Sequence, residues 1–499
     1  MRQSGVLMPV SALPSRYGIG AFSKEAYEFI DQLKKAGQKK WQLLPLGPTG
    51  YGDSPYQPFS TYAGNPYYID LEALIEEKLL TEEECGRFVF GQAEDKVDYG
   101  QLYQTRFQVL EIAYQRFKGI IQTDRRIADS YQLFLDQNAF WLKDYCLFMA
   151  IKKEQGDVSW TEWPLDLKLR QPDAVKEAEK RLDSEIDFYN FIQYEFYQQW
   201  DKLHRYANDL QIELIGDMPI YVSMDSADVW AHPEVFQLEE DLTPKAVAGC
   251  PPDGFTADGQ LWGNPLYDWE YQRKTDYIWW VNRIAFQLGI YDILRVDHFR
   301  GFDAYYAIPY GDVDARNGVW KKGPGMELFD RLKERLGDVR IIAEDLGFLT
   351  DSVRELVKQT GYPGMKILQF AFDPREQSDY LPYHYEKNCV VYTGTHDNNT
   401  IQGWFTSLDP ETKDYVRSYL DNSHTPEDQI YWDFIRLSLS SVADLSIIPV
   451  QDLLGLGEEA RINVPSTLGG NWTWRLKKGQ LSEESLLRFR RMTKVYGRG

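Results

Sequence analysis

Eight short apolar segments, each followed by a polar or glycine-rich turn, constrain the fold of this chain most strongly. They are residues 5–10, 41–46, 212–216, 292–296, 339–343, 365–370, 389–392 and 445–450. Helical patterns separate most of these segments, and strands that alternate with helices usually form parallel sheets. The pattern therefore predicts an α/β fold, a (β/α)8 TIM barrel, with functional residues at the carboxyl ends of the strands.

An open, doubly wound sheet is the alternative architecture. Its nucleotide-binding form has a Gly-x-Gly-x-x-Gly turn after the first strand, and no such turn follows residues 5–10. Charged residues also follow several predicted strands, whereas an open sheet collects them at one switch point. The barrel is therefore favoured.

The chain has 499 residues, a length that α/β barrels with insertions reach as one unit. We expect a single catalytic unit over 1–499, with a helical insertion at 70–206 between the second and third strands and further loop insertions at the C-terminal face. Two stripes at helical spacing support the insertion, namely Phe107, Leu110, Tyr114 and Phe117, and Phe188, Ile192, Phe196, Trp200 and Leu203. Gly119 is predicted to end the first of these helices.

Composition limits the partners. With 76 acidic and 55 basic residues the net charge is −21, which argues against nucleic acid and against an anionic membrane surface. The aromatic content of 15% suits sugar rings as well as a well-filled core. Four separated cysteines form no Cys-x-x-Cys pair, and neither a signal peptide nor a membrane-spanning run is evident, so a cytoplasmic location is expected.

Charged residues end the fourth predicted strand. Because side chains alternate along a strand, Arg295 and Asp297 share one face, and a carboxylate beside a permanent cation keeps its charge. A structural ion pair that fixes the strand end explains this pair equally well. Other strand ends must decide between the two interpretations.

Three more carboxylates follow other predicted strands. Asp217 follows the third, Glu344 the fifth, and Asp397, with His396 beside it, the seventh. The strand ends of a barrel converge on one mouth, so these acids are expected to meet in space.

Such a cluster serves either a divalent metal or glycoside chemistry. Arginines beside the acids, at Arg295 and Arg300, favour glycoside chemistry. Cleavage of a glycosidic bond needs one ionised carboxylate and one protonated carboxylic acid. We expect Asp297, held ionised by Arg295, to take the first role, and Glu344, its pKa raised by neighbouring negative charges, to take the second.

Several motifs together resemble glycoside hydrolase family 77, the amylomaltases or 4-α-glucanotransferases, which are related to the α-amylases. They are Gly50–Gln57, Gly216–Ile220, Leu261–Tyr267, Arg295–Gly301, Ala343–Gly347 and Thr395–Thr400. The resemblance extends over nearly the whole chain, from Pro9 to Trp474, and the order and spacing of the motifs agree with the family.

The resemblance implies a nucleophile at Asp297, a general acid and base at Glu344, and a third, stabilising carboxylate at Asp397. It also implies a set of sugar-contacting residues: Tyr56, Asp217, Phe255, Trp262, Arg295, His298, His396 and Asn463. For Trp262 a core position at a tight turn is nearly as well supported, and His298 is either a contact or a structural residue. The paired acids of a retaining enzyme are expected about 5–5.5 Å apart.

The implied reaction is transfer of a 1,4-α-glucan segment to the 4-hydroxyl of glucose or of another maltooligosaccharide. Residues 245–268 resemble the acceptor-side loop of the family, and Phe255 in it would shield the intermediate from water. A retaining α-glucan hydrolase is the alternative function, and a non-catalytic glucan-binding barrel is a third. The sequence gives no sign of a cofactor or metal, and it leaves the oligomeric state open.

Overall fold

The computed structural model describes residues 2–499 apart from 51, 253–255, 348, 376 and 468. Eight parallel strands close into a barrel in the order β1-β12-β11-β10-β9-β6-β3-β2. Their bounds are β1 Gln3–Leu7, β2 Lys40–Gln42, β3 Glu213–Met218, β6 Ile293–Val296, β9 Ile341–Ala343, β10 Gly364–Ile367, β11 Cys389–Tyr392 and β12 Leu445–Pro449. Each predicted segment supplies one of these strands, so the predicted (β/α)8 barrel is confirmed.

The barrel interior is an apolar core. Inward side chains from the strands form one buried cluster, comprising Leu7, Ile215, Ile293, Ile342, Met365, Ile367, Val390, Tyr392, Leu445 and Ile447. Branched and long apolar residues fill a barrel of this strand number without leaving a channel. The polar residues that follow the strands are therefore displaced to the mouth.

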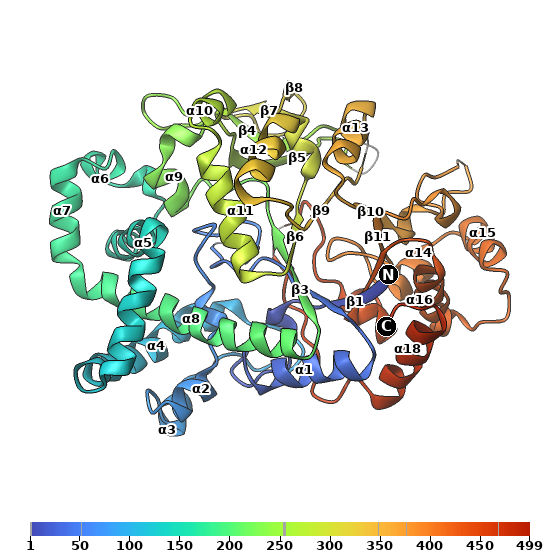
Figure 1. The fold of residues 1–499 in the computed structure, drawn as a ribbon, viewed down its shortest axis with the longest axis horizontal. Helices are drawn as coiled ribbons and strands as arrows, with labels where there is room; N and C mark the ends of the chain where they lie inside the picture. Colours follow the sequence, from blue (N-terminus) through green and yellow to red (C-terminus); the bar gives the residue numbers. More distant parts are fainter. Residues whose placement is uncertain (1, 51, 253–255, 348, 376, 468) are drawn as a thin grey trace.

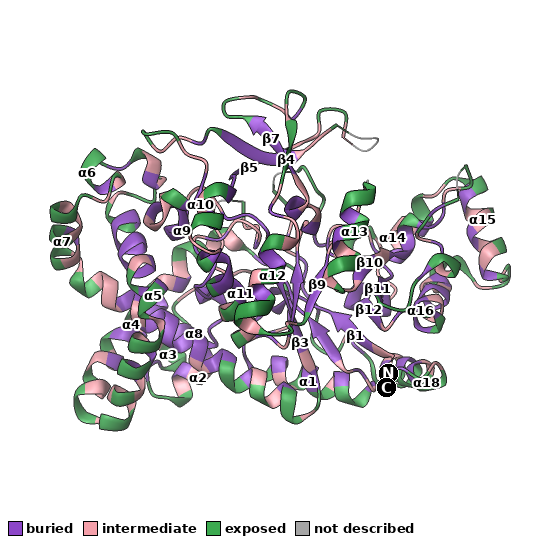
Figure 2. Cartoon of the chain, turned by 45° about the horizontal axis from the view of Figure 1, so that its top comes forward, coloured by how far each residue is buried: buried purple, intermediate pink, exposed green. Residues whose placement is uncertain are grey.

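Helices surround the strands (Figure 1). Those that follow β1 or lie after β3 are α1 Lys24–Lys35, α9 Ala227–Ala231, α10 Trp269–Lys274, α11 Ile278–Ile290, α12 Met326–Leu336, α13 Asp351–Thr360, α14 Ile401–Ser407, α15 Pro410–Leu420, α16 Ile430–Ser440, α17 Val450–Leu453 and α18 Glu483–Val495. Figure 2 shows buried strands at the centre and exposed outer helix faces. No described helix combines the length and apolar composition needed to cross a bilayer.

The segment between β2 and β3 is mainly helical. It contains α2 Leu71–Glu76, α3 Glu82–Cys85, α4 Tyr99–Thr123, α5 Arg125–Glu154, α6 Leu165–Lys168, α7 Pro172–Arg181 and α8 Asp183–Asp209. The five residues of the second predicted stripe are all buried in α8. The predicted end at Gly119 is wrong, because α4 continues to Thr123. The stop lies at Asp124, whose side chain accepts hydrogen bonds from Arg126 N and Ile127 N and so caps α5.

A four-stranded antiparallel sheet lies beyond the mouth, at the top of Figure 1, in the order β5-β4-β7-β8. Its strands are β4 Ala246–Cys250, β5 Gln260–Pro265, β7 Ala304–Pro309 and β8 Val319–Lys322. Residues 245–268 were predicted to form a loop at the C-terminal face. Much of this segment is instead the pair of strands β4 and β5. The small residues of β4 and the Gly263-Asn264-Pro265 end of β5 carry little strand signal, and β4 pairs on its other side with β7, which is distant in sequence.

Candidate active site

Strand register brings the predicted acids to the mouth. In β3 and β6, Asp217 pairs with Arg295 and Met218 with Val296, so Asp297 follows directly beyond the paired residues. Val296 pairs with Ala343 of β9, and Glu344 is the next residue. The adjacent strands β3, β6 and β9 thus present Asp217, Asp297 and Glu344 side by side.

One guanidinium group holds these acids together. Arg295 Nη1 lies 2.6 Å from both carboxylate oxygens of Asp217 and 3.3 Å from Asp297 Oδ1, while its Nη2 lies 3.1 Å from Glu344 Oε1. The Arg295 side chain is 1% exposed. Charge-assisted contacts of this kind are strong in a buried setting. The sequence predicted an Arg295–Asp297 pair, whereas the closest partner is Asp217.

Asp297 and Glu344 are hydrogen-bonded to each other. Burial and the Glu344 charge raise the pKa of Asp297 well above its usual value. Burial also acts to raise the pKa of Glu344, but Arg295 and the His298 backbone N–H outweigh it and hold that pKa below its usual value. These directions reverse the predicted ones, because the guanidinium is shared and the extra N–H favours Glu344 as the charged member.

The separation of about 5–5.5 Å expected of a retaining pair stays a prediction. Both carboxyl groups contact the same guanidinium, Asp297 at 3.3 Å and Glu344 at 3.1 Å.

The turn after β6 aims a backbone donor at Glu344. His298 adopts a left-handed backbone with φ 49°, an uncommon conformation for a residue with a side chain. Its N–H donates to Glu344 Oε2 at 2.5 Å. Burial lowers the pKa of the His298 ring to about 4, so the imidazole is neutral near pH 7. The ring packs edge to face against Trp262 of β5, with 4.8 Å between centroids.

Asp397 lies on the other side of the mouth, after β11. Asn463 Nδ2 donates to Asp397 Oδ1 at 2.7 Å, and His396 Nε2 lies 3.4 Å from the same oxygen. Tyr56 stacks on the His396 ring with 5.1 Å between centroids, and its hydroxyl donates to Asp217 at 2.8 Å. Tyr56 therefore links the Asp397 side to the Arg295 cluster.

Two groups at the mouth were missed from the sequence. Trp472 packs with its ring centroid 5.8 Å from that of Tyr56 and 5.9 Å from that of His396. Arg461 Nη2 donates to the Asp397 carbonyl at 2.7 Å. An isolated tryptophan and arginine far along the chain carry no motif. The positive φ of 63° at Trp472 is a sign of local strain that becomes visible in the structure.

The remaining predicted contact, Phe255, lies outside the described residues. Strand β5, which follows this position in the sequence, is fixed to the segment that carries Tyr56, because the side chains of Gln57 and Asn264 exchange hydrogen bonds of 3.0 and 3.2 Å.

Among the residues that the structure describes, no group of three or more His, Cys, Asp or Glu side chains is placed to hold a metal ion.

Comparisons with known proteins identify the family of this chain. The family model described as 4-alpha-glucanotransferase matches residues 8–482. A 4-alpha-glucanotransferase of Clostridium butyricum is 49% identical over 493 residues, covering 98% of this chain and 100% of that protein. One from Thermus thermophilus is 44% identical over 499 residues, covering 99% and 98%. The amylomaltase of Streptococcus agalactiae, solved in complex with acarbose, matches with a TM-score of 0.96 and 42% identity over 100% of both chains.

A (β/α)8 barrel with acids grouped around one arginine at its mouth is an arrangement suited to the cleavage of glycosidic bonds. The family match covers most of the chain, and the relatives match along their full length. The chain belongs to the 4-alpha-glucanotransferase family and is a glycosyl-transferring enzyme.

Proposed function

We propose that the protein cleaves a 1,4-α-glucan and transfers the released segment to the 4-hydroxyl of glucose or of another maltooligosaccharide, with net retention, in the cytoplasm. The observation that carries this proposal is the hydrogen-bonded Asp297–Glu344 pair beneath one shared arginine. Two carboxyl groups with one proton between them supply the nucleophile and the acid that a double displacement needs.

In the first step Asp297 attacks the anomeric carbon and Glu344 protonates the departing glycosidic oxygen. In this structure the proton is favoured on Asp297, so it passes to Glu344 along their hydrogen bond as the sugar binds. The growing positive charge at the anomeric carbon favours this transfer, because it stabilises an ionised Asp297. The C–O bond breaks with inversion, and a glycosyl ester forms on Asp297.

In the second step the 4-hydroxyl of an acceptor attacks the same carbon. Glu344, now ionised, accepts the hydroxyl proton, and the ester bond to Asp297 breaks. The second inversion restores the original configuration. The shared proton returns to the pair, so the cycle is balanced.

The other residues bind and orient the sugar. Asp397, held by Asn463, accepts hydrogen bonds from ring hydroxyls that strengthen as the ring distorts. Asp217, His396 and His298 supply polar contacts, and Tyr56 and Trp262 supply flat faces. Arg295 is a positioning residue that fixes both reacting carboxyl groups.

Two larger parts complete the proposal. Residues 70–206 form an insertion subdomain of the single catalytic unit 1–499, and 245–268 form the acceptor side of the site. The edge contact between Trp262 and His298 supports the second assignment, because it joins β5 to the residue after Asp297.

Incubation with maltotriose tests the function. We expect glucose together with longer oligosaccharides, while the total number of reducing ends stays constant. A steady rise in reducing ends with shorter products alone would replace transfer by hydrolysis.

A further inference from the structure

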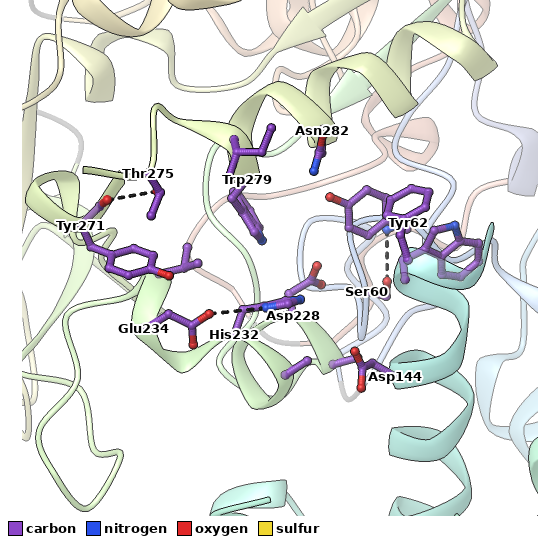
Figure 3. Close-up of a pocket in the computed structure, with 16 residues that line it drawn as sticks. Ser60, Tyr62, Asp144, Asp228, His232, Glu234, Tyr271, Thr275, Trp279 and Asn282 are labelled. Carbon is purple, nitrogen blue, oxygen red and sulfur yellow. Dashed lines mark hydrogen bonds and ion pairs between the residues drawn. The ribbon is translucent and has the colours of Figure 1, made fainter. Parts of the chain in front are cut away.

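A second hollow, separate from the residues assigned to the mouth, lies where the helical insertion meets the barrel. Its volume is about 220 Å³. Helix α5 contributes Phe140, Trp141 and Asp144, and α11 contributes Trp279 and Asn282. Figure 3 shows side chains from both helices around one space, with Tyr62 between them. The proposed mechanism uses none of these residues, so the hollow needs its own explanation.

Aromatic rings form much of the wall. Tyr62 and Trp141 stack with 6.1 Å between centroids and 20° between planes, and Phe140 meets Tyr62 edge-on at 5.4 Å. Trp279 extends into the space from α11 (Figure 3). Phe140 is 53% exposed, although a large apolar side chain is usually buried. Flat, partly open aromatic faces are suited to a ring-shaped ligand with apolar CH groups.

The acidic groups in the hollow already have partners. Arg170 Nη2 lies 2.6 Å from Asp144 Oδ1, and His232 Nδ1 lies 3.5 Å from Glu234. The Glu234 hydrogen bond raises the pKa of His232, which favours its charged form. These pairings leave little net charge to attract a cationic ligand, and the carboxylates repel phosphate.

Asp228 is a further hydrogen-bonding group of the hollow. Burial raises its pKa to about 6, although the backbone N–H of Thr61 donates to it at 2.8 Å. The carboxyl oxygens can accept hydrogen bonds from sugar hydroxyl groups. The Asn282 amide, which faces the space from α11 (Figure 3), can both donate to such hydroxyl groups and accept from them. Hydrogen-bonding oxygens beside flat aromatic faces are an arrangement that suits a polyhydroxylated ring.

We infer that this hollow is a second saccharide site, which binds one or two glucose units of a long glucan while another part of the polymer occupies the mouth. Its volume is below the roughly 300–1,000 Å³ of pockets that enclose drug-sized ligands, so one or two sugar rings fit better than a longer segment. The choice of glucose units rests on the proposed function.

The backbone links this second site to the mouth. Thr61 Oγ1 accepts from Arg283 Nε at 2.7 Å, and Arg283 Nη1 donates to the Ile220 carbonyl at 2.9 Å. The segment from Tyr56 to Tyr62 therefore has one end at each site and is anchored between them. A glucan bound at both sites would span a fixed distance.

The test compares a long and a short donor. Phe140→Ala and Asn282→Ala remove an exposed ring and an exposed amide, so neither change disturbs a buried core. We expect each variant to raise KM for amylose about threefold to tenfold, the size of one lost ring or hydrogen-bond contact, and to leave KM and kcat for maltotriose unchanged. Leu133→Ala is the matched control, because Leu133 is 56% exposed on the same helix α5.

Hydrogen exchange locates the binding. In the inactive Glu344→Gln background, maltohexaose should slow exchange at the mouth and also at residues 138–145 and 275–282. Protection confined to the mouth, equal KM values for amylose in all variants, or an equal rise in Leu133→Ala would overturn the second site. If tetramethylammonium but not maltose abolished the protection that maltohexaose gives at these residues, the hollow would be a cation site. That result would also overturn the second saccharide site.

The two proposals fail separately. If the wild-type protein did not transfer glucose units between maltotriose molecules, the proposed function would be refuted, whether or not hydrogen exchange at 138–145 is slowed. Normal transfer from maltotriose without protection at 138–145 would refute the second site alone.

Discussion

The two ends of the barrel carry similar residue types on the same strands but balance their charges differently. At the amino-terminal end, Glu213 of β3 contacts both Lys40 of β2 and Arg340, which directly precedes β9. Asp292, which precedes β6, lies 3.1 Å from His204 Nε2. Glu213 and Asp292 therefore each have a cationic or titratable partner of their own. Arg340 is also in contact with solvent, since its side chain is 53% exposed.

At the mouth, Asp217, Asp297 and Glu344 share the single guanidinium of Arg295, which is 1% exposed. An excess of buried acids costs folding free energy, whereas a balanced and solvated cluster costs little. The contrast teaches that strand ends with paired charges stabilise the barrel, and strand ends with surplus acids are available for chemistry.

The largest expected effect comes from Glu344→Gln. This change keeps the shape of the side chain and removes the proton carrier, so kcat on maltotriose should fall by a factor of about 10²–10⁴ while glucan binding persists. Product analysis and calorimetric titration with maltohexaose measure the two quantities. Unchanged turnover would contradict the role of Glu344.

Asp297→Asn removes the nucleophile, so no covalent glycosyl adduct should form on this variant. Mass spectrometry would detect such an adduct.

Arg295→Met tests the charge balance directly. Three carboxyl groups at the mouth, of which Asp217 is fully buried, would lose their cation, and the free energy of unfolding should fall by about 3–5 kcal/mol in urea denaturation at pH 7. Arg340→Met is the matched change at the other barrel end and should cost about 0–1 kcal/mol, because Arg340 is solvated. Equal losses in the two variants would remove the distinction between the ends.

The pH dependence of stability offers a third test. The folded pKa of His298 is about 4, below the usual 6.5, so the unfolded chain binds this proton first as the pH falls. The stability that depends on neutral His298 is complete above pH 6.5 and is lost progressively toward pH 4, by up to about 3 kcal/mol. His298→Gln should flatten the unfolding free energy over this window; the same slope in both proteins would argue against a buried neutral imidazole.

The smallest effect is expected for Asn463→Ala, which removes the 2.7 Å hydrogen bond to Asp397. One such bond to a charged group contributes about 1.5–3 kcal/mol, so kcat/KM should fall roughly tenfold to a hundredfold with little change in thermal midpoint. Steady-state kinetics with maltotriose measures this, and a change confined to the melting temperature would make Asn463 structural.

Parts of the fold could be predicted because their signal is local. Each barrel strand is a short apolar run with a polar end, and α8 repeats its buried side chains at helical spacing. The β4–β5 pair was missed because the small residues of β4 favour no element by themselves, and β4 pairs with β7 across a long sequence separation. Local propensity does not report such a contact.

The site shows the same limit. The acids at strand ends were visible in the sequence, since their position follows from the barrel. The preference of Arg295 for Asp217 and the donor from His298 N–H to Glu344 depend on side-chain direction and on a left-handed turn. For that reason the pKa is raised at Asp297 and lowered at Glu344, whereas the sequence predicted a raised pKa at Glu344.

The shared guanidinium of Arg295 has a consequence for how this mouth can change over evolution. A substitution at Asp217, Asp297 or Glu344 alters the charge that the other two experience through the same cation, so the effects of paired substitutions will not add. A lineage therefore cannot exchange these positions one at a time at independent cost.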